Sequence, residues 1–220
     1  MTVVEPTLRL ERSLLKDEFD LIIALDEVGR GALAGPVAVG AAVMDAAGSR
    51  RRVPAGLRDS KLIPERRRAD MAAHAAGWVQ ASAVGWATAA EIDDVGIITA
   101  LGRAASRAVD AVSGGAVDAA RTLVILDGNH DYLSLVHRSR LTVRTVIKGD
   151  RDCASVSAAS VIAKVARDAQ MAQFHESHPA YRWDRNKGYA SAEHREAIRT
   201  HGLSPFHRAS WAIADAPTLF

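Results

Sequence analysis

The 220-residue sequence has a single cysteine, Cys153, and few aromatic side chains, which make up 5% of its residues. One thiol can form neither an intramolecular disulfide nor a cysteine cage for a metal. No apolar run is long enough to cross a membrane, and residues 1–20 are charged throughout, unlike a secretion signal. We therefore expect a cytoplasmic protein with no membrane partner.

The sequence also lacks a strong excess of charge of one sign. Its formal net charge is +2, so it has no polycationic tail of the kind that binds nucleic acid indiscriminately. Basic residues gather instead at 50–52, 66–68 and 182–187, and any one of these clusters could be a solvated surface. Three such clusters in a chain with grouped carboxylates favour contact with a phosphate backbone.

Several common motifs are missing as well. Gly29 to Gly35 has the spacing G-x-G-x-x-x-G, one residue longer than the dinucleotide-binding motif, and a strand-like run begins at Pro36 where that motif requires a helix. Neither G-x-x-x-x-G-K-[ST] nor G-x-S-x-G occurs, which argues against a nucleotide-hydrolysing phosphate loop and an acyl-transfer triad. Three C-terminal histidines lack the helical spacing and cysteine partners of a zinc site. These are His194, His201 and His207.

Five apolar or alternating runs predict β-strands, and at 48% hydrophobic residues the chain can bury the core of one domain. The predicted strands are 21–25, 36–44, 83–87, 122–126 and 141–147. Helical patterns follow from residue 65, at 89–94, 97–112, 153–175 and 190–201. Small side chains at 154–160 would let the 153–175 helix pack closely on the sheet or on a ligand. This alternation predicts an α/β fold, with residues 1–20 as a peripheral helix or a frayed arm.

Four carboxylates stand where predicted strands end. Asp26 and Glu27 end the first strand, Asp127 ends the fourth, and Asp150 follows the fifth. If the strands are parallel neighbours, their acids converge at the carboxyl edge of the sheet. Two simpler explanations stay open, because Asp127-Gly is an ordinary turn signal and Asp150 or Asp152 could cap the next helix.

Grouped carboxylates without competing cysteine favour Mg²⁺ or Mn²⁺, since both ions prefer oxygen ligands. Two such ions a few ångströms apart could activate water and stabilise the leaving oxygen in an attack on a phosphodiester. Lys61 lies before a predicted helix, where it could touch a phosphate or stay solvated.

Short motifs occur in a fixed order along nearly all of the chain after residue 20. They are DEVGRG at 26–31, DSK at 59–61, LDGN at 126–129, KGD at 148–150, SAASVIAKVARD at 157–168, KGY at 187–189 and HR at 207–208. Together they resemble bacterial ribonuclease HII, the type 2 ribonuclease H. The resemblance implies a ribonuclease H-like fold with a central mixed five-stranded sheet, flanking helices and a helical C-terminal extension. It suggests an arm at 1–20, a catalytic core at 21–178, and a substrate-binding segment at 179–220 within the same domain.

The resemblance also implies an activity and assigns roles to residues. A monomeric endonuclease would cut the RNA strand of RNA/DNA hybrids, and duplex DNA on the 5′ side of single ribonucleotides, leaving 3′-hydroxyl and 5′-phosphate ends. Asp26, Glu27, Asp127 and Asp150 would be its catalytic, metal-binding acids. The backbone of Gly29, Arg30 and Gly31 would read the ribose 2′-hydroxyl, where a side chain would keep the sugar away. Tyr189 would pack on the neighbouring sugar, and Ser60, Lys61 and Lys164 would support phosphate or active-site contacts.

Two departures and two alternatives accompany this interpretation. Ala190 follows the tyrosine where proline or glycine is common, and Trp211 replaces a usual phenylalanine. A DNA-junction nuclease or recombinase of the same superfold would share the acids without needing a ribose-reading loop. The non-enzymatic alternative is a hybrid-binding module that has lost turnover, and the intact set of acids argues against it.

Overall fold

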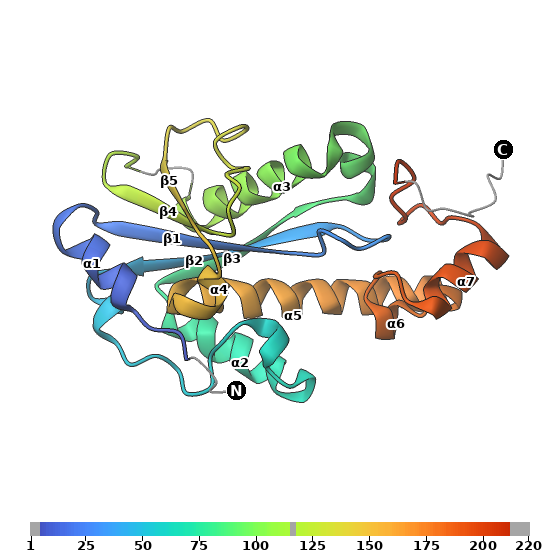
Figure 1. The fold of residues 1–220 in the computed structure, drawn as a ribbon, viewed down its shortest axis with the longest axis horizontal. Helices are drawn as coiled ribbons and strands as arrows, with labels where there is room; N and C mark the ends of the chain where they lie inside the picture. Colours follow the sequence, from blue (N-terminus) through green and yellow to red (C-terminus); the bar gives the residue numbers. More distant parts are fainter. Residues whose placement is uncertain (1–4, 115–117, 212–220) are drawn as a thin grey trace.

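The computed structural model describes residues 5–114 and 118–211, so the outermost parts of the expected arm and C-terminal segment, 1–4 and 212–220, lie outside the described residues (Figure 1). A five-stranded mixed sheet has the order β3-β2-β1-β4-β5. β1 is antiparallel to β2 and parallel to β4, and β4 is parallel to β5. The strands are β1 (Leu21–Val28), β2 (Val37–Asp45), β3 (Ala81–Ala87), β4 (Thr122–Asp127) and β5 (Thr142–Val146).

Helices cover both faces of this sheet, with α3 on one side and α5 and α2 on the other (Figure 1). α3 bends at Gly96, whose φ of +77° separates the two helical segments that the sequence predicts. The helices are α1 (Arg9–Asp17), α2 (Glu65–Trp78), α3 (Ala89–Ser113), α4 (Gly149–Asp152), α5 (Ala154–Ser177), α6 (Trp183–Asn186) and α7 (Ala192–His201). None of the helices within the described ranges is long and apolar enough to cross a bilayer.

All five predicted strands are present, with two informative differences at their ends. β1 continues to Val28, so Asp26 and Glu27 belong to the strand and do not follow it. β5 is shorter than predicted and mostly exposed, because it forms an edge of the sheet.

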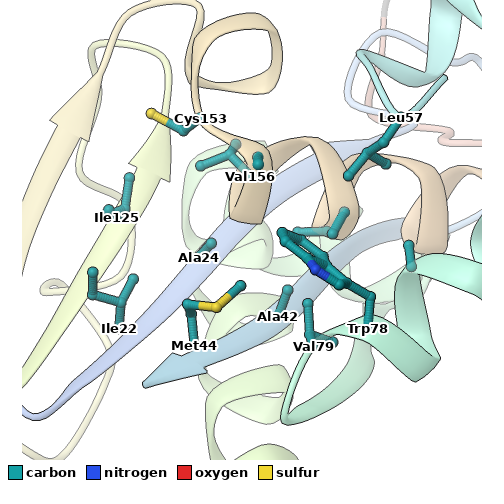
Figure 2. Packing of buried hydrophobic residues seen from close by; sticks show 14 of the residues in the cluster. Ile22, Ala24, Ala42, Met44, Leu57, Trp78, Val79, Ile125, Cys153 and Val156 are labelled. Carbon is teal, nitrogen blue, oxygen red and sulfur yellow. The ribbon is translucent and has the colours of Figure 1, made fainter. Parts of the chain in front are cut away.

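Alternate residues of β1 enter two separate hydrophobic cores, as the alternation of side chains along a strand requires. Ile22 and Ala24 pack with Met44, Trp78 and Val156 on the α2 and α5 side (Figure 2). Their neighbours along the strand pack on the α3 side, together with Leu101 and Tyr132. These neighbours are Ile23 and Leu25.

The first two turns of α5 lie directly against the sheet. The predicted close packing is confirmed, because six small side chains of these turns are almost fully buried: Ala154, Ser155, Ser157, Ala158, Ala159 and Ser160. β2 contributes a glycine at the contact: a Cβ at Gly40 would lie 2.3 Å from the Ala159 carbonyl oxygen. A larger residue at either position would push the helix away from the sheet.

The N-terminal segment docks onto the start of α5. Glu11 is fully buried, and one of its carboxylate oxygens accepts hydrogen bonds from the backbone N–H of Ser155 at 3.0 Å and from its hydroxyl at 2.7 Å. Thr7 exchanges backbone hydrogen bonds with Asp152 and Ala154. Glu11 therefore supplies an acceptor at the helix N-terminus from a segment far away in sequence.

The sequence had offered Asp150 or Asp152 as the cap of α5, and that alternative is wrong. Both residues lie in the short helix α4, and Cys153 precedes α5 without a side-chain capping bond. α4 separates Asp150 from the first residue of α5, and Glu11 supplies the side-chain acceptor there instead.

The C-terminal elements pack around the far end of α5 (Figure 1). Met171 of α5, Trp183 of α6 and Ile198 of α7 belong to a third buried cluster that also contains Leu33 and Ala34. This cluster connects the loop after β1 to the last described part of the chain.

Candidate active site

Two of the predicted acids end neighbouring parallel strands. Leu25 pairs with Leu126, so Asp26 of β1 and Asp127 of β4 occupy the next position along their strands. Both side chains follow Ala24 and Ile125 on the α5 face, by the alternation of the strands. Convergence of these two acids at the carboxyl edge of the sheet is therefore present in the structure.

Asp150 joins this edge through α4. Its backbone N–H donates to Asp127 Oδ1 at 3.1 Å, and Asp150 is 7% exposed as a whole residue, as is Asp26. Burial raises the pKa of Asp150 to about 6, and the charge of Asp127 adds to this effect. Asp127 is therefore engaged with the backbone of α4, and the simple turn explanation does not describe it.

Glu27 leaves β1 on the opposite face from Asp26. Its carboxylate accepts a hydrogen bond from the Tyr132 hydroxyl at 3.4 Å and lies 3.8 Å from the Arg30 guanidinium. Burial raises the pKa of Glu27, while the charge of Arg30 lowers it. The sequence does not indicate a role for Tyr132, because no local pattern links it to Glu27, which lies 105 residues earlier.

The four carboxylates influence one another electrostatically. Burial raises the pKa of Asp26 well above its usual value, and the charges of Asp127, Glu27 and Asp150 raise it further. A hydrogen bond from Ser160 opposes these effects. Within residues 5–114 and 118–211, no three Asp, Glu, His or Cys side chains already lie close enough together to coordinate one metal ion. The arrangement is thus a repelling cluster of oxygen donors, whose cost a bound cation would offset.

A cleft of about 370 Å³ opens beside these acids. Most of the residues that sequence analysis singled out line it, although Asp127 and Asp150 do not. The lining residues are Asp26, Glu27, Val28, Gly29, Arg30, Gly31, Ser60, Lys61, Lys164 and Tyr189. Segments from four distant parts of the chain therefore meet around one hollow.

The two glycines of the loop after β1 differ in their surroundings. Gly29 has a φ of +85°, and a Cβ there would lie 2.0 Å from Arg167 Nε. Among residues 5–114 and 118–211, and apart from Gly31 and its two chain neighbours, no atom lies within 4 Å of a Cβ built at Gly31. The fold itself requires glycine at position 29, whereas at position 31 the space is open for a ligand.

Two fully buried arginines bind backbone carbonyl groups of this loop and of the segments next to it. Arg208 donates to the carbonyl oxygens of Gly29 at 2.6 Å and Arg30 at 2.8 Å. Arg167 donates to those of Pro36 and Lys187, each at 2.9 Å. Neither guanidinium has a carboxylate within salt-bridge distance in the described part of the chain, and burial lowers the pKa of Arg208 to about 9.

Sequence analysis did not assign these arginines a role. Arg167 stood inside a helical pattern, and the dipeptide at 207–208 was only one of several matching motifs. Apart from Lys187, their carbonyl partners lie more than a hundred residues away, so no local spacing indicates them.

The three supporting residues stand in different environments. Lys61 is largely exposed, and its Nζ lies 4.0 Å from Asp150 Oδ2. Lys164 is instead held by both carboxylate oxygens of Asp168 at 2.6 Å. Ser60 is buried, and its hydroxyl oxygen lies 3.1 Å from that of Ser160. Of these three residues, only Lys61 has a largely exposed side chain close to the acids.

Tyr189 also lines the cleft and is 37% exposed. The guanidinium carbon of Arg167 lies 5.5 Å from its ring centroid. The preceding Gly188 has a φ of +85°, and a Cβ there would lie 2.4 Å from the Ala34 carbonyl oxygen. The tight approach of these backbones sets where the tyrosine stands relative to the glycine loop.

Comparison with known proteins agrees with this arrangement. The family model described as Ribonuclease HII matches residues 23–214. A Ribonuclease HII from Streptomyces avermitilis is 46% identical over 212 residues, which cover 96% of this chain and 85% of that protein.

Solved structures show the same fold. The ribonuclease H2 from Pyrococcus horikoshii OT3 superposes with a TM-score of 0.73 at 23% identity, covering 88% of this chain and 95% of that one. Bst-RNase HIII in complex with Mn²⁺ gives 0.72 at 21% identity, covering 93% of this chain and 70% of that one. The predicted fold, a mixed five-stranded sheet flanked by helices, is confirmed.

Proposed function

The chain belongs to the ribonuclease HII family, a family of ribonucleases, and from this premise we propose that it hydrolyses the RNA strand of RNA/DNA hybrids. We further propose that it incises duplex DNA on the 5′ side of a single ribonucleotide, leaving 3′-hydroxyl and 5′-phosphate ends. The observation that carries the proposal is the shared cleft, in which Asp26 and Glu27 stand beside the glycine loop and Tyr189.

Asp26, Glu27, Asp127 and Asp150 would hold Mg²⁺ or Mn²⁺. All four supply oxygen donors, and a divalent cation would offset both causes of the raised pKa of Asp26, its burial and the repulsion by the other acids. Two such ions, when bound, would stabilise charge on the attacking and leaving oxygens of an in-line displacement at phosphorus. The complex of Bst-RNase HIII with Mn²⁺, a protein of the same fold, supports this choice of cation.

The glycine loop would recognise the ribose through its backbone. In a trans peptide the N–H points opposite to the carbonyl oxygen. Because Arg208 binds the carbonyls of Gly29 and Arg30, the N–H groups of Arg30 and Gly31 point away from this buried guanidinium. They are then free to donate to a 2′-hydroxyl, and the open space at Gly31 lets a sugar approach.

The other cleft residues would position the strand. Tyr189 would pack on the sugar next to the ribonucleotide, because its ring is exposed at the cleft and supported by Arg167. Lys61 would contact a phosphate, and Ser60 and Lys164 would support the walls of the cleft.

The decisive experiment incubates the folded protein with duplex DNA that contains one ribonucleotide, in Mg²⁺ and separately in Mn²⁺. We expect a single nick on the 5′ side of the ribonucleotide and none in an all-DNA duplex. Absence of cutting with either ion would overturn the proposal, and binding without cutting would support a hybrid-binding module instead. Cutting of all-DNA junctions would favour the junction nuclease.

A second substrate separates the roles of cleft residues. Tyr189→Ala should impair incision at a single ribonucleotide more than cleavage of a uniform RNA/DNA hybrid, because only the first depends on one sugar junction. Equal losses on both substrates would argue against that role for Tyr189.

A further inference from the structure

Two buried histidines form a direct contact beneath the Tyr189 loop. His194 lies on α7 and His207 in the loop that follows, and they are 0% and 3% exposed. Their Nε2 atoms are 3.1 Å apart. Two imidazole nitrogens at this distance require a proton on one of them and a lone pair on the other.

The partners of His194 determine where its proton resides. Nδ1 lies 2.9 Å from the Tyr189 carbonyl oxygen, which can only accept, so Nδ1 carries the hydrogen. The indole N–H of Trp183 donates to Nε2 at 3.1 Å. Neutral His194 therefore donates through Nδ1 and accepts through Nε2.

His207 has the opposite arrangement. The backbone N–H of Ser204 donates to its Nδ1 at 2.9 Å, and the Ser204 hydroxyl lies at the same distance. Nδ1 therefore carries the lone pair, and the hydrogen is on Nε2, facing His194. The chain from Ser204 through both rings to Tyr189 has one consistent direction of donation.

We propose that His194 is a positioning residue for Tyr189, and that His207 holds His194 in the tautomer that donates to the Tyr189 carbonyl. This inference rests on the proposed function, in which Tyr189 packs on a sugar. The same carbonyl also accepts from the Ser191 N–H at 2.8 Å, so His194 strengthens a turn that already exists. The Tyr189 carbonyl thus contacts His194, while its ring contacts Arg167 at the cleft.

The surroundings oppose a proton on either ring. Protonated His194 would place an N–H against the N–H groups of Trp183 and His207, and protonated His207 would place one against the Ser204 N–H. Burial lowers the pKa of both histidines, with His207 at about 4. The charged and titratable groups facing the pair are Arg195 of α7, His178 at the end of α5 and Tyr181 of the 3-10 turn at Pro179–Tyr181.

The kinetic test compares His194→Leu with His194→Asn, because the asparagine amide places an N–H near the position of Nδ1. His194→Leu should lower kcat/KM on the single-ribonucleotide duplex by about tenfold, the size of one lost hydrogen bond, and affect a uniform hybrid less. His194→Asn should recover most of this loss. The matched control is His201→Asn, because His201 lies on the same helix and is exposed. This variant should leave kcat/KM unchanged on both substrates.

A double-mutant cycle distinguishes positioning from general stability. In a Tyr189→Ala background, His194→Leu should have little further effect, because the ring that it positions is gone. Full additivity, or equal losses on both substrates, would overturn the proposal. Failure of His194→Asn to recover activity would also overturn it.

A readout without substrate tests the relay itself. Nitrogen NMR of the full chain at pH 7 should show His194 protonated at Nδ1 and His207 at Nε2, and any other tautomer or a charged ring overturns the relay. Amide exchange at 188–191 should accelerate in His194→Leu but not in His201→Asn. If the wild type cuts neither substrate, the proposed function fails, but the NMR and amide-exchange measurements still test the relay. If His194→Leu does not fold, the same two measurements are made on His194→Asn.

Discussion

Asp26 and Glu27 are consecutive in sequence, yet their side chains leave β1 on opposite faces of the sheet. Asp26 faces α5 and Ser160, whereas Glu27 faces Tyr132 and Arg30. Both still line the same cleft, because the strand ends at its edge. The site therefore gathers its acids around a strand end, and each acid has its own supporting partners.

Neutralising Asp26 should separate stability from function. Asp26→Asn is expected to reduce cleavage by on the order of a hundredfold or more, since a preorganised charged group at the reacting centre is lost. Without metal at pH 8, it should raise the free energy of unfolding by about 1 kcal/mol or more, because a buried and repelled charge is removed. Urea unfolding in a chelator measures this, with exposed Asp94→Asn as the control; a lower stability would contradict the repulsion.

Alanine at the two loop glycines should give opposite results. Gly29→Ala must displace Arg167 and adopt an unfavourable φ, so we expect a loss of about 2 kcal/mol or more in stability. In Gly31→Ala the new methyl group meets no atom of the described chain beyond its two neighbours in sequence, so Tm should stay unchanged while KM for ribonucleotide-containing duplexes rises. Calorimetry and steady-state kinetics on both variants check this, and an equal fall in Tm would refute the distinction.

The two lysines of the cleft should also behave differently. Lys164→Gln leaves Asp168 without its closest cation in a largely buried position, which should cost about 1–3 kcal/mol of stability. Lys164→Gln combined with Asp168→Asn should recover much of the lost stability.

Lys61→Gln should leave stability unchanged, because Lys61 is exposed. It should weaken hybrid binding and make that binding less dependent on salt concentration. Denaturation curves and binding at several salt concentrations would show the difference.

Acid should destabilise the wild type partly through His207. Its folded pKa of about 4 lies below the ordinary value of 6.5, so its contribution is complete above pH 6.5 and is lost as the pH falls toward 4. His207→Gln keeps a donor toward His194 and removes the titration, so its stability should fall less steeply over this range. Unfolding measured from pH 7 to pH 4 compares the two proteins, and parallel curves would rule out His207 as the titrating group. The raised pKa of Asp150, about 6, acts in the other direction and is common to both proteins.

The sequence predicted the parts of this molecule that depend on local patterns. Apolar runs indicated five strands, and acids at strand ends indicated an edge where Asp26 and Asp127 meet, because strand periodicity and parallel pairing determine both. It could not show that β1 extends through Asp26 to Val28, since charged residues rarely continue a buried strand.

Other features depend on contacts between distant segments. Arg208 and Arg167 are buried charges whose partners are backbone carbonyls, and carbonyls leave no mark in a sequence. Glu11 stood in a segment that composition suggested was peripheral, although it is fully buried against Ser155. The relay between His194 and His207 was visible only as a histidine set unsuited to zinc.

The long separations of these contacts also bear on how the site forms. Glu11 meets Ser155 across 144 residues, and Arg208 meets Gly29 across 179. Closing such long loops is entropically unfavourable until most of the chain is collapsed, so contacts of this kind form late in folding. During synthesis the glycine loop leaves the ribosome long before the arginine that orders it. In a newly made chain all five strands would therefore be available for pairing before Arg208 can order the glycine loop.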